Sequence, residues 1–228
     1  ANAQPLVRQP RVLVVTESVF SMDGDHAPLR ELVELKDRYG AWLMVDEAHA
    51  TGLYGPTGAG LVQELGLRDR VEIQMVTLGK ALGAAGGAIC GSRALIELLI
   101  NRARSFIYST APVPAAAAAA TAAIKLVQSE TGAQLRQALW QRVAELNAAI
   151  SNPQSAKSSA IVPIVIGDEA RAVQLSAELL ERGFFIPAVR YPTVPRGKAR
   201  LRITLTAVHS PDDVMALAHA LKTLNTSF

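Results

Sequence analysis

The chain has 228 residues, of which 50% are hydrophobic and 19% are charged. This proportion of apolar residues provides for a sizeable core and excludes an intrinsically disordered chain. The formal net charge is only +3 and the arginines are scattered along the sequence, which argues against nucleic acid as a partner.

The first half of the chain alternates short apolar runs with amphipathic segments. Strands are expected at 12–16, 42–45, 71–77 and 87–90, and helices at 28–39, 61–65 and 93–104. Pro28 favours a helix start, Gly40 a helix end and Ser92 an N-cap. The run 12–16 is apolar on both faces and predicts a buried strand with neighbours on both sides. Strands that alternate with helices predict an α/β fold with a mostly parallel sheet covered by helices.

The second half begins with two long helical stretches, and the first of them is rich in alanine, the best helix former. Helices are expected at 114–129, 131–150, 170–182 and 211–224, and strands at 161–166, 184–189 and 200–206. Pro163 predicts an edge position or an irregularity in its strand. We expect a partial large domain over residues 1–128 and a small C-terminal α+β domain over residues 129–228.

Two features of the sequence bear on location. The run 111–124 is mostly alanine, contains two prolines and is too short to cross a bilayer, so the sequence indicates no membrane association. Cys90 is the only cysteine, which excludes an internal disulfide and a cysteine-based zinc site. A single cysteine fits a reducing compartment, and we expect a cytoplasmic protein.

Polar residues follow three of the expected strands. In an open α/β sheet, ligands bind outside the carboxyl ends of the strands. Asp46 and His49 follow the strand 42–45, and a carboxylate near an imidazole can bind a metal, relay protons or hold a heteroaromatic cofactor. A turn-capping aspartate followed by an ordinary loop histidine explains the same residues equally well. Ser21 follows the strand 12–16 and offers a hydroxyl that could contact phosphate.

Lys80 lies between glycines and apolar residues, just after the expected strand that ends at Thr77. In a partly desolvated pocket the pKa of a lysine amine falls, as formation of a Schiff base requires. A phosphate-binding loop is the competing interpretation. However, Gln74 and Ala81 stand where G-x-x-x-x-G-K-[ST] requires glycine and a hydroxyl residue. The dinucleotide motif G-x-G-x-x-G and the serine motif G-x-S-x-G are also absent.

The three strand ends together supply an amine, a carboxylate, an imidazole and hydroxyls. These groups suit a Schiff base, a pyridinium nitrogen, a phenolic oxygen and a phosphate, which are the binding needs of pyridoxal 5′-phosphate. We expect no metal site, because Asp23, Asp25 and His26 are neighbours on one loop and no second cluster supports them.

Five segments together resemble the α-oxoamine synthase family. They are TESVFSMDGD (16–25), MVDEAHATGLYG (44–55), TLGKALGAAGG (77–87), FIYSTAPVP (106–114) and YPTVPRGKARLRITLTA (191–207). They occur in the family's order and spacing. The resemblance implies a transferase of the pyridoxal-phosphate fold type I. It also implies that the family's N-terminal portion is missing here, because residues 1–11 contain neither its glycine–aromatic turn nor its ring-stacking histidine.

The resemblance implies a role for each catalytic residue. Lys80 would form the Schiff base with the cofactor, Asp46 would contact the ring nitrogen, and His49 would donate to the ring hydroxyl. Ser21 and Thr77 would contact the cofactor through their hydroxyls.

Four further residues match positions that bind the substrate or the cofactor. Arg202 matches the residue that binds the amino-acid carboxylate, and Thr193 matches another position that contacts the substrate. Ser109 and Thr110 lie in a segment that reaches the cofactor phosphate of the partner subunit in the family. The resemblance therefore implies a homodimer with a shared active site.

The segments DEAHATG and FIYST favour the family's alanine-using reaction. In it, L-alanine condenses with a pimeloyl thioester, of coenzyme A or a carrier protein, and loses carbon dioxide to give 8-amino-7-oxononanoate for biotin synthesis. A glycine-using activity (glycine C-acetyltransferase or 5-aminolevulinate synthase) is the alternative, because a pocket distinguishes one methyl group by only about 1–3 kcal/mol. A third alternative is an inactive fragment or a non-catalytic dimerisation partner.

Overall fold

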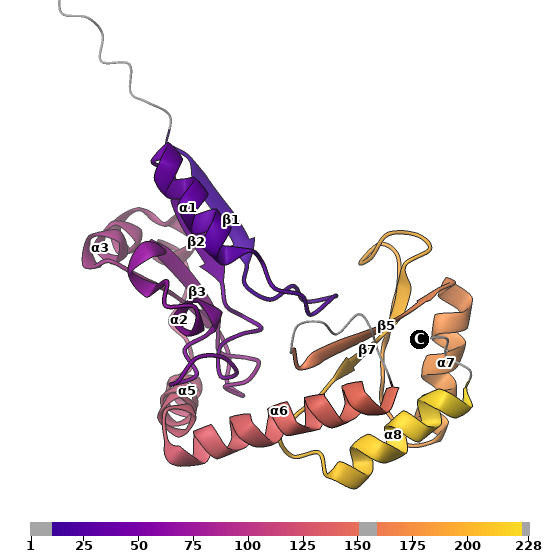
Figure 1. Ribbon diagram of the computed structural model, residues 1–228. Coiled ribbons are helices and arrows are strands. Elements are labelled where there is room, and N and C mark those ends of the chain that lie inside the picture. The colour runs from indigo at the N-terminus through magenta and orange to yellow at the C-terminus, as the bar shows by residue number, and fades with distance from the viewer. Residues whose placement is uncertain (1–10, 151–158, 225–228) are drawn as a thin grey trace, which may run out of the picture. The chain divides into compact units, whose positions relative to one another are not determined.

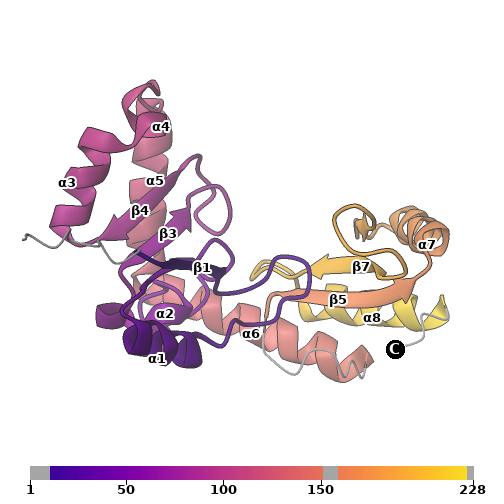
Figure 2. The same ribbon diagram turned by 90° about the horizontal axis from the view of Figure 1, so that it is seen from above.

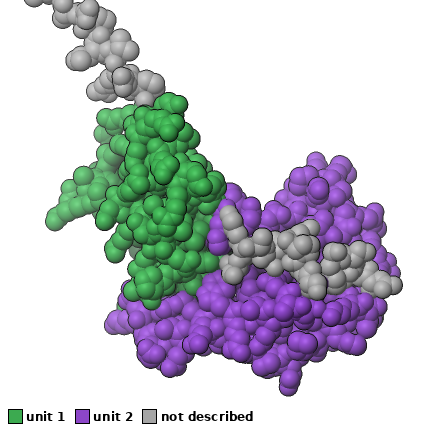
Figure 3. Space-filling view, viewed as in Figure 1, with its two compact units in different colours: residues 1–18, 27–123 green, residues 19–26, 124–228 purple. Residues whose placement is uncertain are grey.

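The computed structural model describes residues 11–150 and 159–224 of the chain (Figure 1). The chain forms two compact units. Within the described residues, unit 1 comprises residues 11–18 and 27–123, and unit 2 comprises residues 19–26, 124–150 and 159–224 (Figure 3). Residues 1–10, on which part of the expectation about the missing N-terminal portion depends, lie outside the described residues.

Unit 1 is built on a four-stranded sheet with the strand order β1-β2-β3-β4. Figure 2 shows this sheet, with β1, β3 and β4 labelled. The strands are β1 (Leu13–Glu17), β2 (Trp42–Asp46), β3 (Ile73–Thr77) and β4 (Gly87–Gly91). The first three strands run parallel, and β4 pairs antiparallel with β3. Glu17 pairs with Asp46, and Asp46 pairs with Met75, so the three parallel strands end at the same edge of the sheet. The predicted α/β fold with a mostly parallel sheet is confirmed.

The helices of the first half begin and end close to where the sequence predicts. They are α1 (Leu29–Tyr39), α2 (Leu61–Glu64), α3 (Arg93–Arg102), α4 (Arg104–Ile107) and α5 (Pro114–Val127), with a 3₁₀ turn η1 (Arg68–Arg70). Gly40 ends α1 in the left-handed conformation, with φ of 60°. The Ser92 side chain caps α3 by accepting a hydrogen bond from the Leu95 N–H at 3.3 Å. The single helix expected at 93–104 is interrupted at Ala103, which has extended backbone angles.

Strand β1 differs from the expectation of a fully buried strand. Leu13 and Val15 have 45% and 61% of their surface exposed. The strand takes the outer place in the sheet, and within the described residues it pairs with β2 alone. Its apolar residues therefore extend over a face and an edge that the described part of the chain leaves open.

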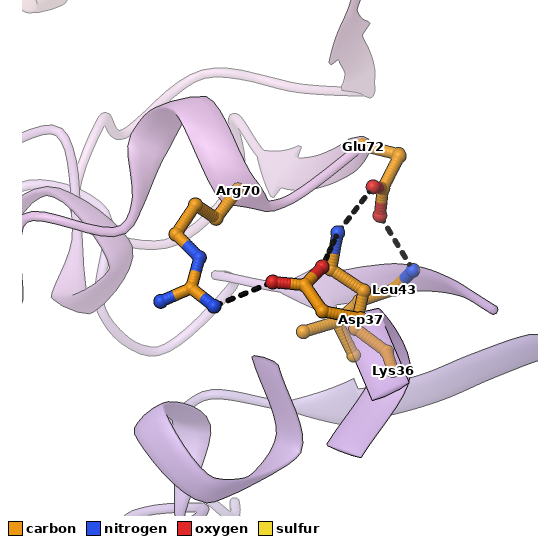
Figure 4. Close-up of polar contacts among 5 residues, drawn as sticks. All are labelled: Lys36, Asp37, Leu43, Arg70 and Glu72. Atoms are coloured by element: carbon orange, nitrogen blue, oxygen red, sulfur yellow. Dashed lines mark hydrogen bonds and ion pairs between the residues drawn. The ribbon is translucent and has the colours of Figure 1, made fainter. Parts of the chain in front are cut away.

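An ionic network fixes α1 to the amino ends of β2 and β3 (Figure 4). The Lys36 ammonium lies 2.5 Å from Glu72 Oε1 and 2.8 Å from Asp37 Oδ1. Glu72 also accepts the Leu43 N–H at 2.8 Å, and Arg70 contacts Asp37 at 2.5 Å. Burial opposes the charge of Lys36, but the hydrogen bonds to Asp37 and Glu72 outweigh it and raise the Lys36 pKa. The network lies at the opposite end of the strands from the candidate site.

Unit 2 contains a three-stranded antiparallel sheet of order β5-β7-β6. Its elements are α6 (Glu130–Ile150), β5 (Ile161–Gly167), α7 (Glu169–Glu181), β6 (Ala188–Val189), β7 (Ala199–Thr204) and α8 (Pro211–Thr223). Strand β5 lies at the sheet edge and has a register shift between Val165 and Gly167, so the prediction made from Pro163 is confirmed. The strand expected at 184–189 is reduced to two residues.

The core of unit 2 is aliphatic. Leu201 and Ile203 of β7, Leu175 of α7 and Leu221 of α8 are each at most 1% exposed. Helix α8 packs along α6 (Figure 1), and it begins with a capping box in which Ser210 and Asp213 bind each other's backbone N–H. Among the helices of residues 11–150 and 159–224, none combines the length and hydropathy of a membrane span.

Candidate functional site

Four of the predicted site residues lie at the carboxyl edge of the unit 1 sheet. Asp46 is the last residue of β2, and His49 belongs to the turn that follows. Thr77 is the last residue of β3, and Lys80 lies in the loop between β3 and β4. Because β2 and β3 are parallel neighbours, the two loops leave the sheet side by side, as the sequence predicts.

Backbone hydrogen bonds hold the turn that carries Asp46 and His49. The Asp46 Oδ1 atom accepts the Ala48 N–H at 2.7 Å. The Glu47 N–H donates to the Met75 carbonyl at 2.8 Å, which ties the turn to β3. The Glu47 carbonyl accepts the Ala50 N–H at 2.9 Å. These bonds fix the direction in which the Asp46 carboxylate leaves the sheet.

The loop of Lys80 is compact and rich in glycine. The Leu78 N–H donates to the Gly86 carbonyl at 2.9 Å, and the Gly83 N–H donates to the Lys80 carbonyl at 3.0 Å. The sequence suggested a partly desolvated pocket around Lys80, but in the structure the Lys80 side chain is exposed. The neighbours of Lys80 in this loop are small residues such as Gly79 and Ala81, which cover little of a long side chain.

The two loops pack against each other through small residues. Gly52 has φ of +87°, and a Cβ atom added to it would lie 2.7 Å from the Cβ of Ala81. Only glycine permits this approach, because a side chain would be strained by the positive φ and would collide with Ala81. The segment that carries Asp46 and His49 is thus in direct contact with the residue that follows Lys80.

The Thr77 hydroxyl fits an external ligand. Its Oγ1 atom is buried and has no hydrogen-bond partner within the described residues. Nearly all buried polar atoms in folded proteins are hydrogen-bonded, so such an atom calls for an explanation. A phosphate or another polar group of a cofactor, bound beside the amine of Lys80, would supply the partner.

Glu47 is a residue of this edge that the sequence reasoning passed over. It is 0% exposed, and its carboxylate accepts the Ser18 hydroxyl at 2.6 Å and the Val62 N–H at 2.7 Å. Burial raises its pKa, against the effect of these hydrogen bonds. The signal in the sequence is its place directly after Asp46, within the segment 44–55 that resembles the family.

In unit 2 the structure brings together Ser21 and Arg202. The Arg202 Nε donates to the Ser21 carbonyl at 2.7 Å, and its Nη1 donates to the Thr204 hydroxyl at 3.0 Å. Arg202 is half-buried, and desolvation lowers its pKa below the ordinary value of an arginine. The segment that contains Ser21 therefore anchors one side of Arg202, the residue predicted to bind the carboxylate.

A second arginine anchors the same segment. Arg200, 5% exposed, forms an ion pair with Asp23 and donates to the Met22 carbonyl at 3.2 Å. A Cβ atom at Gly24, which has φ of +68°, would lie 2.5 Å from the Ile161 carbonyl oxygen. The segment Val19–His26 is thus held against β5 and β7 of unit 2.

The remaining predicted residues are exposed. Thr193 lies in the turn after the cis Tyr191–Pro192 bond, and its N–H donates to the Arg190 carbonyl at 3.0 Å. Ser109 and Thr110 follow α4 in unit 1. The part of the chain that the structure describes contains no group of three or more His, Cys, Asp or Glu residues arranged to hold a metal ion.

Residues 2–221 match the family model described as aminotransferase class I and II. A curated relative, the 8-amino-7-oxononanoate synthase of Anaeromyxobacter dehalogenans strain 2CP-C, is 52% identical over 215 residues, which cover 94% of this chain and 54% of the relative. The chain therefore spans about half the length of the curated relatives that it matches.

Solved structures of two related enzymes share the fold. A variant of serine palmitoyltransferase from S. paucimobilis with a bound PLP–myriocin aldimine has a TM-score of 0.89 and 28% identity, and the match covers 98% of this chain and 58% of that one. The 8-amino-7-oxononanoate synthase from Francisella tularensis has a TM-score of 0.80 and 28% identity, covering 96% of this chain and 63% of that one.

Proposed function

The chain belongs to the aminotransferase class I and II family, and from this premise we propose that it carries the cofactor-binding lysine of a pyridoxal 5′-phosphate-dependent acyltransferase. The observation that carries the proposal is the packing of the Lys80 loop on the turn of Asp46 and His49, through Gly52 and Ala81, at the carboxyl edge of the sheet. The buried, unpartnered hydroxyl of Thr77 at this edge supports it.

Each residue of this edge has a role in the proposal. Pyridoxal 5′-phosphate, when bound, supplies an electron sink for the negative charge that develops at the Cα atom of an amino acid. Asp46 holds a proton on the ring nitrogen, His49 donates to the ring hydroxyl, and Thr77 contacts the cofactor through its hydroxyl. Lys80 attaches the cofactor through Nζ, and its freed amine removes the proton from Cα of the substrate.

Residues of unit 2 and the segment after α4 complete the proposal. Arg202 binds the carboxylate of the amino acid, for which its planar guanidinium is well shaped. Ser21 contacts the cofactor, and Thr193 contacts the substrate. Ser109 and Thr110 reach the phosphate site of a second copy of the protein, and the active form is therefore a homodimer. Its proposed location is the cytoplasm.

The substrates in this proposal are L-alanine and a pimeloyl thioester. A carbon–carbon bond forms between Cα of alanine and the acyl carbon, the thiol leaves, and the carboxyl group departs as carbon dioxide. A proton then replaces it at Cα and gives 8-amino-7-oxononanoate. The name of the relative from Anaeromyxobacter dehalogenans, 8-amino-7-oxononanoate synthase, supports this product. Glycine in place of alanine is the alternative within the same chemistry.

The test uses the complete protein that contains this chain. After addition of pyridoxal 5′-phosphate and reduction with borohydride, peptide mass mapping should find the cofactor on Lys80. Lys125→Ala, which alters an exposed lysine of α5, should keep this labelling, whereas Lys80→Ala should lose it together with turnover. Release of thiol from pimeloyl-CoA with alanine, and not with glycine, would support the finer choice. Labelling at another lysine or none would refute the proposal.

A further inference from the structure

Glu47 is a buried carboxylate for which the proposed chemistry has no direct use. It is 0% exposed and lies next to Asp46 in the chain. Burying an ionised carboxylate is costly unless hydrogen bonds compensate for the loss of water. The burial of the Glu47 carboxylate, one position from the residue proposed to contact the ring nitrogen, therefore calls for an explanation.

The hydrogen bonds of Glu47 come from two other elements. Its Oε2 atom accepts the Ser18 hydroxyl at 2.6 Å and the Leu61 N–H at 3.1 Å, and its Oε1 atom accepts the Val62 N–H at 2.7 Å. All three partners are donors, so the position suits a group that accepts at both oxygens. A glutamine would direct an N–H toward the Ser18 hydroxyl or a backbone N–H and would lose at least one of these bonds.

Ser18 connects this carboxylate to the backbone of Asp46. The Ser18 N–H donates to the Asp46 carbonyl at 2.8 Å, and the Ser18 hydroxyl is 3.2 Å from the same oxygen. From the other side, the Glu47 N–H donates to the Met75 carbonyl at 2.8 Å. The peptide unit between Asp46 and Glu47 is therefore bound on one side to Ser18, which directly follows β1, and on the other side to Met75 of β3.

The start of α2 is held by the same carboxylate. A Cβ atom added to Gly60, which has φ of +124°, would lie 2.6 Å from the carboxyl carbon of Glu47. Gly60 thus lets the loop between the turn and α2 approach the buried side chain. The loop that leaves β2 is bound at its beginning by backbone atoms and at its end by the Glu47 carboxylate.

From these contacts we propose that Glu47 is the positioning residue for Asp46 and His49, acting through Ser18 and the start of α2. This inference rests on the proposed function, because it concerns how firmly those two side chains are presented to the cofactor. Residues that orient the ligands of a bound metal commonly change affinity or activity by about 10–100-fold when they are replaced, and we expect a positioning residue beside an organic cofactor to act on the same scale.

The experiment compares Glu47→Gln and Ser18→Ala with the control Glu64→Gln in the complete protein. Glu64 is exposed and accepts the Gly55 N–H of the same loop at 3.1 Å, so its replacement makes the same chemical change outside the buried contact. Three quantities are measured: the dissociation constant for pyridoxal 5′-phosphate, the pH midpoint of the visible band of the bound cofactor, and the urea midpoint of unfolding.

We expect Glu47→Gln and Ser18→Ala to raise the dissociation constant about tenfold and to shift the pH midpoint of the band, because Asp46 no longer holds its place beside the ring nitrogen. Glu64→Gln should leave both unchanged. Should Glu47→Gln fail to fold, Ser18→Ala, which removes one hydroxyl, decides the question alone. Lower urea midpoints with unchanged cofactor affinity and pH midpoint would overturn the inference and leave Glu47 a purely structural residue.

Failure of the inference is distinguishable from failure of the proposed function. If the unaltered protein does not attach pyridoxal 5′-phosphate at Lys80, the proposed function is wrong. If it does, and Glu47→Gln binds the cofactor as the control does, only the positioning role of Glu47 is wrong.

Discussion

Gly52 and Ala81 approach so closely that a Cβ atom on Gly52 would lie 2.7 Å from the Cβ of Ala81. This contact joins the turn of Asp46 and His49 to the loop of Lys80, which are separated in the sequence by the whole of α2 and β3. A side chain at position 52 would collide with Ala81, so the packing of these two segments depends on glycine at this position.

Gly52→Ala should destabilise the protein more than Gly40→Ala. Both glycines have positive φ, +87° and +60°, and alanine in that region costs about 1–2 kcal/mol. A Cβ at Gly40 meets no atom within 4 Å among the described residues, whereas at Gly52 it would collide with Ala81. Overpacking of this kind adds about 1–3 kcal/mol. Urea unfolding of the two variants measures the difference, and equal losses of stability would contradict the contact.

Asp46→Asn should slow proton exchange at Cα of L-alanine by about 10²–10³-fold, as removal of a preorganised electrostatic group does in other enzymes. The amide keeps the shape of the side chain but lacks the negative charge that holds a proton on the ring nitrogen. Asp69→Asn, at an exposed position of η1, is the matched control. The exchange is followed by NMR in deuterium oxide, and exchange at the unaltered rate in Asp46→Asn would refute the role of Asp46.

Arg202→Lys should raise the KM for the amino acid about tenfold, which corresponds to loss of roughly one charged hydrogen bond. Lysine keeps the charge but lacks the planar fork that binds a carboxylate at two points. The dissociation constant for the cofactor should stay unchanged. Arg182→Lys, at an exposed arginine that ends α7, serves as control. Steady-state kinetics with varied L-alanine measure the effect, and an unchanged KM would show that the carboxylate binds elsewhere.

The network around Lys36 should make stability depend on pH at both extremes. For Glu72, burial raises the pKa, but the hydrogen bonds from Lys36 and the Leu43 N–H outweigh it and lower the pKa from 4.5. A lowered carboxyl pKa contributes stability above the ordinary value, and this is lost as the pH falls through the folded-state pKa. The raised pKa of Lys36 acts in the opposite direction: its contribution is complete below pH 10.5 and is lost above it.

Glu72→Gln tests this dependence. It should lower the free energy of unfolding at pH 7 by about 1 kcal/mol, the upper end for ion pairs that solvent reaches, and the difference from the unaltered protein should vanish in acid as Glu72 becomes protonated. Glu97→Gln breaks the pair with Arg93, whose side chain is 92% exposed, and should have almost no effect. A difference that persists in strong acid would indicate lost packing as its cause.

The sequence by itself determined the order and the ends of most elements. Pro28 and Gly40 bound α1, Ser210 begins α8 with its capping box, and Pro163 marks an edge strand. These signals are local, because a helix start or a strand edge depends on backbone preferences and hydrogen bonds within a few residues. The sequence also predicted that Asp46 and Lys80 lie at one edge of the sheet. Strands that alternate with helices run parallel, and the carboxyl ends of parallel strands meet at the same edge.

The tertiary structure alone decided which distant residues meet. Arg200 and Asp23 are 177 positions apart, and Ser18 and Glu47 are 29 apart. It also decided that β1, among the described strands, lies at the outside of its sheet with exposed apolar residues, and that Lys80 is exposed. Periodicity indicates that a side chain is buried but not against what, because burial partners and the hydrogen bonds of a carboxylate such as Glu47 arise only when separate segments pack together.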